Sequence, residues 1–160
     1  MKIFIAHSWT DVRINIQTKT LANELSKHFE IIFLTQARVG KPVLRISDRL
    51  IIVEWPHKRP NRLSDFRFIC RTILSKKPDV FIVHFGATNI SMIAAWALRV
   101  KYRICWMHTL SEQYFQDSKH VFSGKFAFLF RRLAYRLATH VIVMNEFARN
   151  DALLKFNIPP

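Results

Sequence analysis

Glycine is scarce in this chain, with three residues in 160: Gly40, Gly86 and Gly124. Nucleotide-binding loops of the GxGxxG and GxxxxGK[ST] types need several closely spaced glycines to bring backbone amides against phosphate. The sequence therefore argues against a self-contained NAD-binding domain and against a P-loop ATPase.

Cysteine and long apolar runs are scarce as well. Cys70 and Cys105 lie in apolar stretches without CxxC spacing, which predicts reduced, packed thiols of a cytosolic protein rather than a disulfide or a zinc site. Four apolar residues between Lys2 and His7 are too few for a signal peptide. The longest stretch without charge, residues 80–98, is interrupted by polar residues, which favours a strand, a turn and a helix over a membrane span.

Acidic residues are outnumbered, 11 against 25 Lys and Arg, so the net charge is +14. Such a balance attracts nucleic acid, anionic lipid headgroups or phosphorylated substrates, and charge alone does not choose among them. With 50% hydrophobic residues, the chain has enough apolar material for one core, and we expect residues 1–160 to form a single domain.

Short β-branched or aromatic runs alternate with helical patterns along the chain. The runs lack strict alternation, as do strands that are buried on both faces of a parallel sheet. The fold class predicted is therefore α/β, a Rossmann-like doubly wound sheet in the order 3-2-1-4-5-6, with loops over 35–49 and 55–62. The six predicted strands are Ile3 to Ala6, Ile31 to Leu34, Leu50 to Val53, Val80 to Phe85, Ile104 to Met107 and Val141 to Met144.

Three histidines follow strands that are neighbours in this order. His7, His84 and His108 should therefore converge at the carboxyl edge, where doubly wound sheets bind ligands. Alternatively, His84 is an interior histidine and His7 packs against the first helix. A zinc site has little support because no carboxylate is placed to orient the imidazoles. We expect no metal, and His108 is the best candidate to hydrogen-bond a sugar or a phosphate.

Several segments together resemble the N-terminal half of family 4 glycosyltransferases of the GT-B fold. They are LANELSKHFE followed by IIFLT, then KKPDVFIVHFG (76–86), ICWMHT (104–109) and RLATHVIVMNEFARNDALLKFNIPP (136–160). The resemblance implies an acceptor-binding domain that packs against a second domain, with the active site between them. It also implies retaining transfer from a nucleotide-sugar, without a cofactor, to an acceptor that is either a free glycan or a lipid-linked one.

The resemblance assigns roles to individual residues. His108 matches the family histidine that contacts the donor sugar near the reacting carbon, and Asn145 and Glu146 match polar residues that face the cleft. The other predicted substrate-binding residues follow the first, fourth and fifth strands: His7, Ser8, Trp9, His84, Gly86 and Thr109.

Two features depart from the family pattern. Ser8, Trp9, Thr10 and Asp11 replace the glycine pair that usually follows the first strand, and no two glutamates have the Glu-x7-Glu spacing of the nucleotide-binding second domain. We therefore expect that second domain to be absent from this chain, and the isolated chain to be nearly inactive.

The basic segment KFAFLFRRLAYR (125–136) is predicted to be a helix. Its apolar stripe, Phe122, Phe126, Leu129, Phe130, Leu133 and Leu137, is expected to face the core. The opposite face would then contact an anionic membrane or a phosphate, on the cytoplasmic side; an ordinary solvated face is the alternative. The contact residues predicted there are Lys125, Phe128, Arg131, Arg132, Tyr135 and Arg136.

A second class of function stays open. A non-catalytic basic module that binds nucleic acid or a protein would share this composition, but the sequence has no RNP or helix-turn-helix signature. Nucleic acid is therefore not the expected partner.

Overall fold

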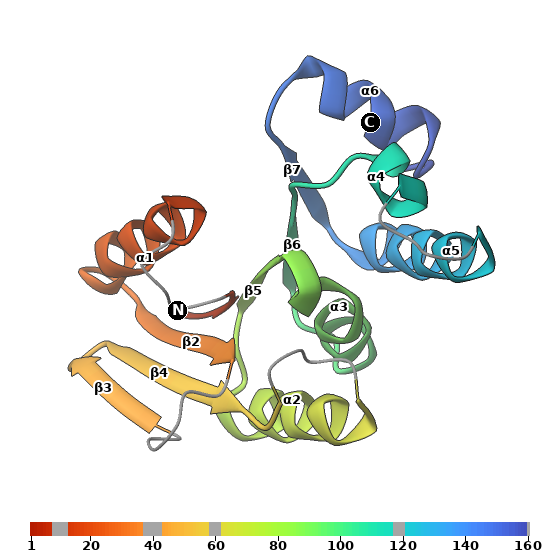
Figure 1. Ribbon diagram of the computed structural model, residues 1–160. Helices are drawn as coiled ribbons and strands as arrows, with labels where there is room; N and C mark the ends of the chain where they lie inside the picture. The colour runs from red at the N-terminus through yellow and green to blue at the C-terminus, as the bar shows by residue number, and fades with distance from the viewer. Residues whose placement is uncertain (8–12, 37–42, 58–61, 117–120, 160) are drawn as a thin grey trace.

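The computed structural model describes residues 1–7, 13–36, 43–57, 62–116 and 121–159. Their seven strands form one sheet in the order β3-β4-β2-β1-β5-β6-β7 (Figure 1). The strands are β1 (Lys2–Ala6), β2 (Glu30–Gln36), β3 (Val43–Ser47), β4 (Leu50–Trp55), β5 (Val80–His84), β6 (Tyr102–Met107) and β7 (His140–Val143). The helices are α1 (Arg13–Ser26), α2 (Leu63–Lys76), the 3-10 turn η1 (Phe85–Ala87), α3 (Thr88–Ala97), α4 (Ser111–Gln116), α5 (Val121–Leu137) and α6 (Glu146–Leu154).

The predicted strand order is confirmed for the six parallel strands, which lie in the order β4-β2-β1-β5-β6-β7. The fold is therefore a Rossmann-like doubly wound α/β sheet. The prediction of a loop over 35–49 is wrong at β3, which pairs antiparallel with β4. All five residues of β3 are exposed, so no buried apolar run marked this edge strand in the sequence.

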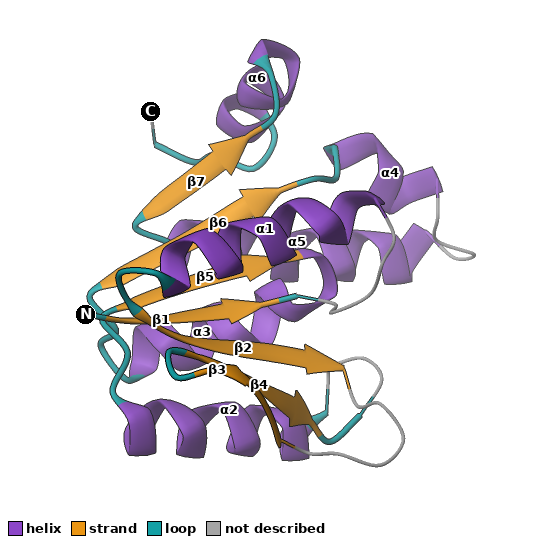
Figure 2. Cartoon of the chain, turned by 90° about the vertical axis from the view of Figure 1, so that its left-hand side faces the viewer, coloured by secondary structure: helices purple, strands orange, loops and turns teal. Residues whose placement is uncertain are grey.

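The core has two layers because alternate strand residues point to opposite faces of the sheet. Phe4 and Phe81 belong to the larger layer, beneath α2, α3 and α5, whereas Ile5 and Phe33 belong to the smaller layer, beneath α1. Figure 2 shows α1 on the near face of the sheet, with α3 and α5 behind it. The thiol of Cys105 is buried in the larger layer, and both cysteines are free, as the sequence predicted.

Helix α5 turns three residues of the predicted membrane face inward. Phe128 packs against the larger core layer, Tyr135 is 2% exposed, and Arg131 is 9% exposed. The predicted core stripe faces outward instead: Phe126 is 70% exposed and Leu129 is 57% exposed. The assignment was therefore wrong for these residues.

The physical reason lies in the small and amphipathic residues of the inward face. Ala134, completely buried, lets the backbone of α5 approach the neighbouring helix α3 closely. Nη1 of Arg131 donates to the carbonyl of Phe85, and the guanidinium lies 5.8 Å from the ring centroid of Tyr135, so the cation has two favourable contacts inside. Of the six predicted contact residues, Lys125 and Arg136 are exposed, and Arg132 is half-buried with its Nε donating to the carbonyl of Phe156. The side chain of Phe122 lies outside what the structure describes.

Candidate active site

The carboxyl edge of the sheet brings His7, His84 and His108 together. His7 follows β1, His84 is the last residue of β5, and His108 follows β6, and these three strands are adjacent. The ring centroids of His7 and His84 are 4.7 Å apart, and those of His84 and His108 are 5.3 Å apart. The predicted convergence is present, and His84 is at once the interior histidine of the alternative interpretation and a member of the cluster.

A hydrogen bond fixes the relative orientation of two of these imidazoles. His84 Nδ1 lies 3.1 Å from His108 Nε2, so one of the two nitrogens carries the proton. His84 Nε2 is buried and has no hydrogen-bond partner among the described residues. Buried N–H groups are rarely left unpaired, which favours a proton on His84 Nδ1 and a bare Nε2. His108 then accepts through Nε2 and carries its own proton on Nδ1.

Two aromatic side chains extend the cluster, and sequence reasoning did not select them. The ring of Phe85 stacks on His108 with centroids 4.1 Å apart and an interplanar angle of 7°. Trp106 stacks on His84 at 5.1 Å. Both signals were present in the sequence, since Phe85 follows His84 directly and Trp106 lies two residues before His108, on the same side of its strand. We call His7, His84, Phe85, Trp106 and His108 the rim cluster.

The backbone at Phe85 adopts φ 46°, a left-handed conformation that costs energy in a residue with a Cβ. Arg131 stabilises it, since Nη1 donates to the Phe85 carbonyl oxygen at 2.7 Å. The sequence offered no signal for this contact, because the two residues are 46 positions apart. A helix late in the chain therefore holds the ring that covers His108.

The three imidazoles are neutral at pH 7. Burial, with a further contribution from the neighbouring His108, lowers the pKa of His7 to about 4. Burial, with contributions from His7 and His108, lowers the pKa of His84 to about 3, and burial lowers the pKa of His108 to about 4. A neutral imidazole both donates and accepts hydrogen bonds, whereas the protonated form only donates. The rim cluster is thus suited to polar, uncharged groups such as sugar hydroxyls.

The remaining predicted site residues are placed as follows. Gly86 is exposed, and a Cβ built on it would meet no atom within 4 Å, so the space beside it is open. Thr109 is half-buried next to His108. Ser8 and Trp9 lie outside the described residues. No three His, Cys, Asp or Glu side chains of the described segments are arranged to hold a metal ion.

Asn145 and Glu146 follow β7 at the same edge of the sheet. Oδ1 of Asn145 accepts from the Ala148 amide at 2.8 Å and so caps α6, while Glu146 pairs with Arg149 at 3.1 Å. Both have local structural roles, and substrate contact by either one stays a prediction.

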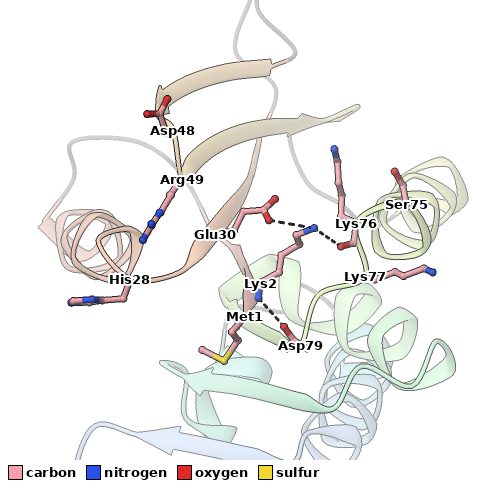
Figure 3. A pocket seen from close by; sticks show the side chains of 10 residues that line it. All are labelled: Met1, Lys2, His28, Glu30, Asp48, Arg49, Ser75, Lys76, Lys77 and Asp79. Carbon is pink, nitrogen blue, oxygen red and sulfur yellow. Dashed lines mark hydrogen bonds and ion pairs between the residues drawn. The ribbon is translucent and has the colours of Figure 1, made fainter.

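A hollow of about 790 Å³ lies at the opposite, amino edge of the sheet (Figure 3). Lys2 points toward Glu30, with Nζ 3.4 Å from Oε2, and also donates to the carbonyl of Lys76. The backbone amide of Lys2 donates to Asp79 at 2.8 Å. Because these charges satisfy one another, the rim cluster is the better candidate for a substrate site.

Comparison with known proteins decides the family. The sequence profile described as Glycosyltransferase Family 4 matches residues 14–160. The chain belongs to glycosyltransferase family 4. Among curated protein sequences, none matches it.

Solved structures agree with this family 4 assignment at the level of the fold. Sucrose-phosphate synthase from Thermosynechococcus elongatus has a TM-score of 0.70 at 15% identity over 96% of this chain. UDP-GlcNAc 2-epimerase from Methanocaldococcus jannaschii has a TM-score of 0.58 at 14% identity over 98% of this chain. The family 4 chain spans 44% of the length of each. Its fold is that of one of the two domains of GT-B proteins.

Proposed function

We propose that this chain is the acceptor-binding part of a retaining glycosyltransferase that moves a sugar from a nucleotide-sugar to a glycan acceptor. The observation that carries the proposal is the rim cluster, a set of neutral imidazoles and flat rings at the edge where doubly wound sheets bind ligands. Family membership supports the reaction class. The nucleotide site would belong to a second domain, and no cofactor is needed.

In such a transfer, the acceptor hydroxyl attacks the anomeric carbon and the nucleotide diphosphate leaves. The protein must hold the two reactants in line and stabilise the separating charges. In this proposal, His108 Nδ1–H donates to a hydroxyl of the donor sugar near the reacting carbon. Phe85 and Trp106 confine the imidazole, and the open space at Gly86 admits the sugar.

We also propose that the acceptor is linked to lipid and that the protein works in the cytoplasm at an anionic membrane surface. The net charge of +14 supports this setting. In the described part of the chain, no helix has the length and apolar character to cross a membrane.

The experiment is a transfer assay on the full-length gene product with a panel of nucleotide-sugars. His108→Ala should lower turnover by about 10²-fold or more with the fold intact, as checked by circular dichroism. His140→Ala, which removes an exposed imidazole on β7, is the matched control. Unchanged turnover in His108→Ala would return His108 to a structural role. Tighter binding to single-stranded RNA than to any vesicle or sugar would favour the nucleic-acid alternative.

A further inference from the structure

The outward face of α5 carries an apolar stripe that no described element covers. Phe126, Leu129 and Leu133 are 70%, 57% and 47% exposed, and the half-buried ring of Phe130 lies 6.1 Å from that of Phe126. Helix α5 lies at the margin of the fold in Figure 1, where its inward side meets α3 and α4. We call Phe126, Leu129, Phe130 and Leu133 the α5 stripe.

The charge beside this stripe has one sign. Helix α5 contains no Asp or Glu, and Lys125, Arg132 and Arg136 recur at helical spacing along one flank of the stripe. Lys125 and Arg136 are exposed. An apolar stripe bordered by cations is the arrangement of helices that lie in the plane of a membrane interface.

Other occupants fit this surface less well. A second copy of the chain would bring two molecules of charge +14 and two identical rows of cations together. The stripe exposes apolar area on the order of a few hundred Å², less than the about 800 Å² that each partner buries in a stable protein interface. A bilayer requires neither a larger patch nor shape complementarity.

We propose that the α5 stripe is the surface through which this protein binds anionic bilayers, with the axis of α5 parallel to the bilayer plane. The inference deepens the proposed membrane setting and rests on it. Its apolar residues are ones that the sequence analysis assigned to the core, whereas its flanking cations Lys125, Arg132 and Arg136 are among the predicted contact residues. Since Arg131 on the inward side contacts Phe85, the rim cluster would lie about one helix diameter, roughly 10 Å, from the interface. A lipid-linked acceptor would then reach the rim without leaving the membrane.

The test is co-sedimentation with two kinds of vesicle, one of phosphatidylcholine alone and one that also contains about 30% phosphatidylglycerol. The wild-type chain should bind the anionic vesicles only. Phe126→Ser with Leu129→Ser should weaken that binding at least tenfold. The matched control is Leu63→Ser with Leu74→Ser, which removes two exposed leucines from α2 and should change binding less than twofold.

The cations are tested in the same way. Lys125→Glu with Arg136→Glu lowers the net charge from +14 to +10, and so does Arg67→Glu with Arg71→Glu on α2. The first pair should abolish binding and the second should reduce it only slightly. Equal losses from both pairs would mean that bulk charge, not the α5 stripe, drives binding.

Two further outcomes would overturn the inference: no binding of the wild type to anionic vesicles, or full binding by the Phe126→Ser, Leu129→Ser variant. If, without vesicles, the wild type sediments faster than that variant, the stripe would instead be a surface for self-association. His108→Ala should bind vesicles like the wild type. Failure of the proposed transfer reaction and failure of the membrane surface therefore have separate readouts.

Discussion

Arg131 donates a hydrogen bond to the carbonyl oxygen of Phe85 at 2.7 Å, and Phe85 in turn stacks on His108. Arg131 is buried, and no described carboxylate forms a salt bridge with it. The role of Arg131 is therefore to hold the backbone at Phe85 in place, not to form an ion pair.

We predict that Arg131→Ala lowers the free energy of unfolding by about 2 kcal/mol, because the carbonyl of Phe85, in a partly buried hydrogen bond, loses its charged donor. Urea denaturation measures this value. Arg136→Ala, on the exposed side of the same helix, should change it by no more than about 0.5 kcal/mol. Equal effects at the two positions would contradict the role assigned to Arg131.

The buried imidazoles make stability depend on pH. In the unfolded chain a histidine binds its proton near pH 6.5, whereas the folded values of His7 and His84 are about 4 and about 3. The unfolded state thus binds more protons as the pH falls, and stability that is fully present above pH 6.5 is lost progressively toward pH 4. Each of these two residues should contribute a loss of about 2 kcal/mol between pH 7 and pH 5.

Denaturation curves at a series of pH values would show this slope, and His84→Gln should make it shallower. A free energy of unfolding that stays flat from pH 7 to pH 5 would mean that the imidazoles are less buried than the structure shows.

The tautomer of His108 is open to a direct test. The amide nitrogen of Asn occupies about the position of Nδ1 of histidine, whereas that of Gln occupies about the position of Nε2. Because His84 engages Nε2 and leaves the proton on Nδ1, His108→Asn should retain more transfer activity than His108→Gln. Turnover measurements on the full-length gene product decide this, and ¹⁵N chemical shifts of the imidazoles give an independent readout. The reverse ranking would place the proton on Nε2.

The isolated chain should bind nucleotide-sugars weakly, with millimolar affinity or none. Its three glycines provide no phosphate-binding loop, and the proposed second domain would supply the contacts to phosphate and base. Isothermal titration calorimetry with several nucleotide-sugars is the measurement. A micromolar dissociation constant would show that the donor site lies in this chain.

The sequence sufficed for those parts of the fold that are dictated by burial. The apolar runs at Ile31 to Leu34 and Val80 to Val83 are buried, and the helical segments between the strands lead to the observed order. Since that order decides which strand ends are neighbours, the meeting of His7, His84 and His108 was predictable. The N-cap at Asn145 and the edge strand β3 depend on local contacts with little apolar signature and were not predicted.

The orientation of α5 was not predictable from periodicity, because both faces of this helix are apolar. Pattern analysis buries the more hydrophobic face, which holds Phe126 and Leu133. The protein instead buries the face with Ala134 and Arg131, where close helix packing and a carbonyl acceptor compensate for fewer large side chains. Neither the close helix packing nor the carbonyl acceptor can be recognised from the sequence of α5 alone, because both depend on neighbouring elements.

The two faces of α5 also connect two equilibria. One face holds Phe85 through Arg131, and the other is the proposed contact with the bilayer. If a ligand at the rim shifts the helix and changes the affinity for vesicles by some factor, thermodynamic linkage requires vesicles to change the affinity for that ligand by the same factor. Membrane binding and ligand binding at the rim cluster would then be coupled through one side chain, the guanidinium of Arg131.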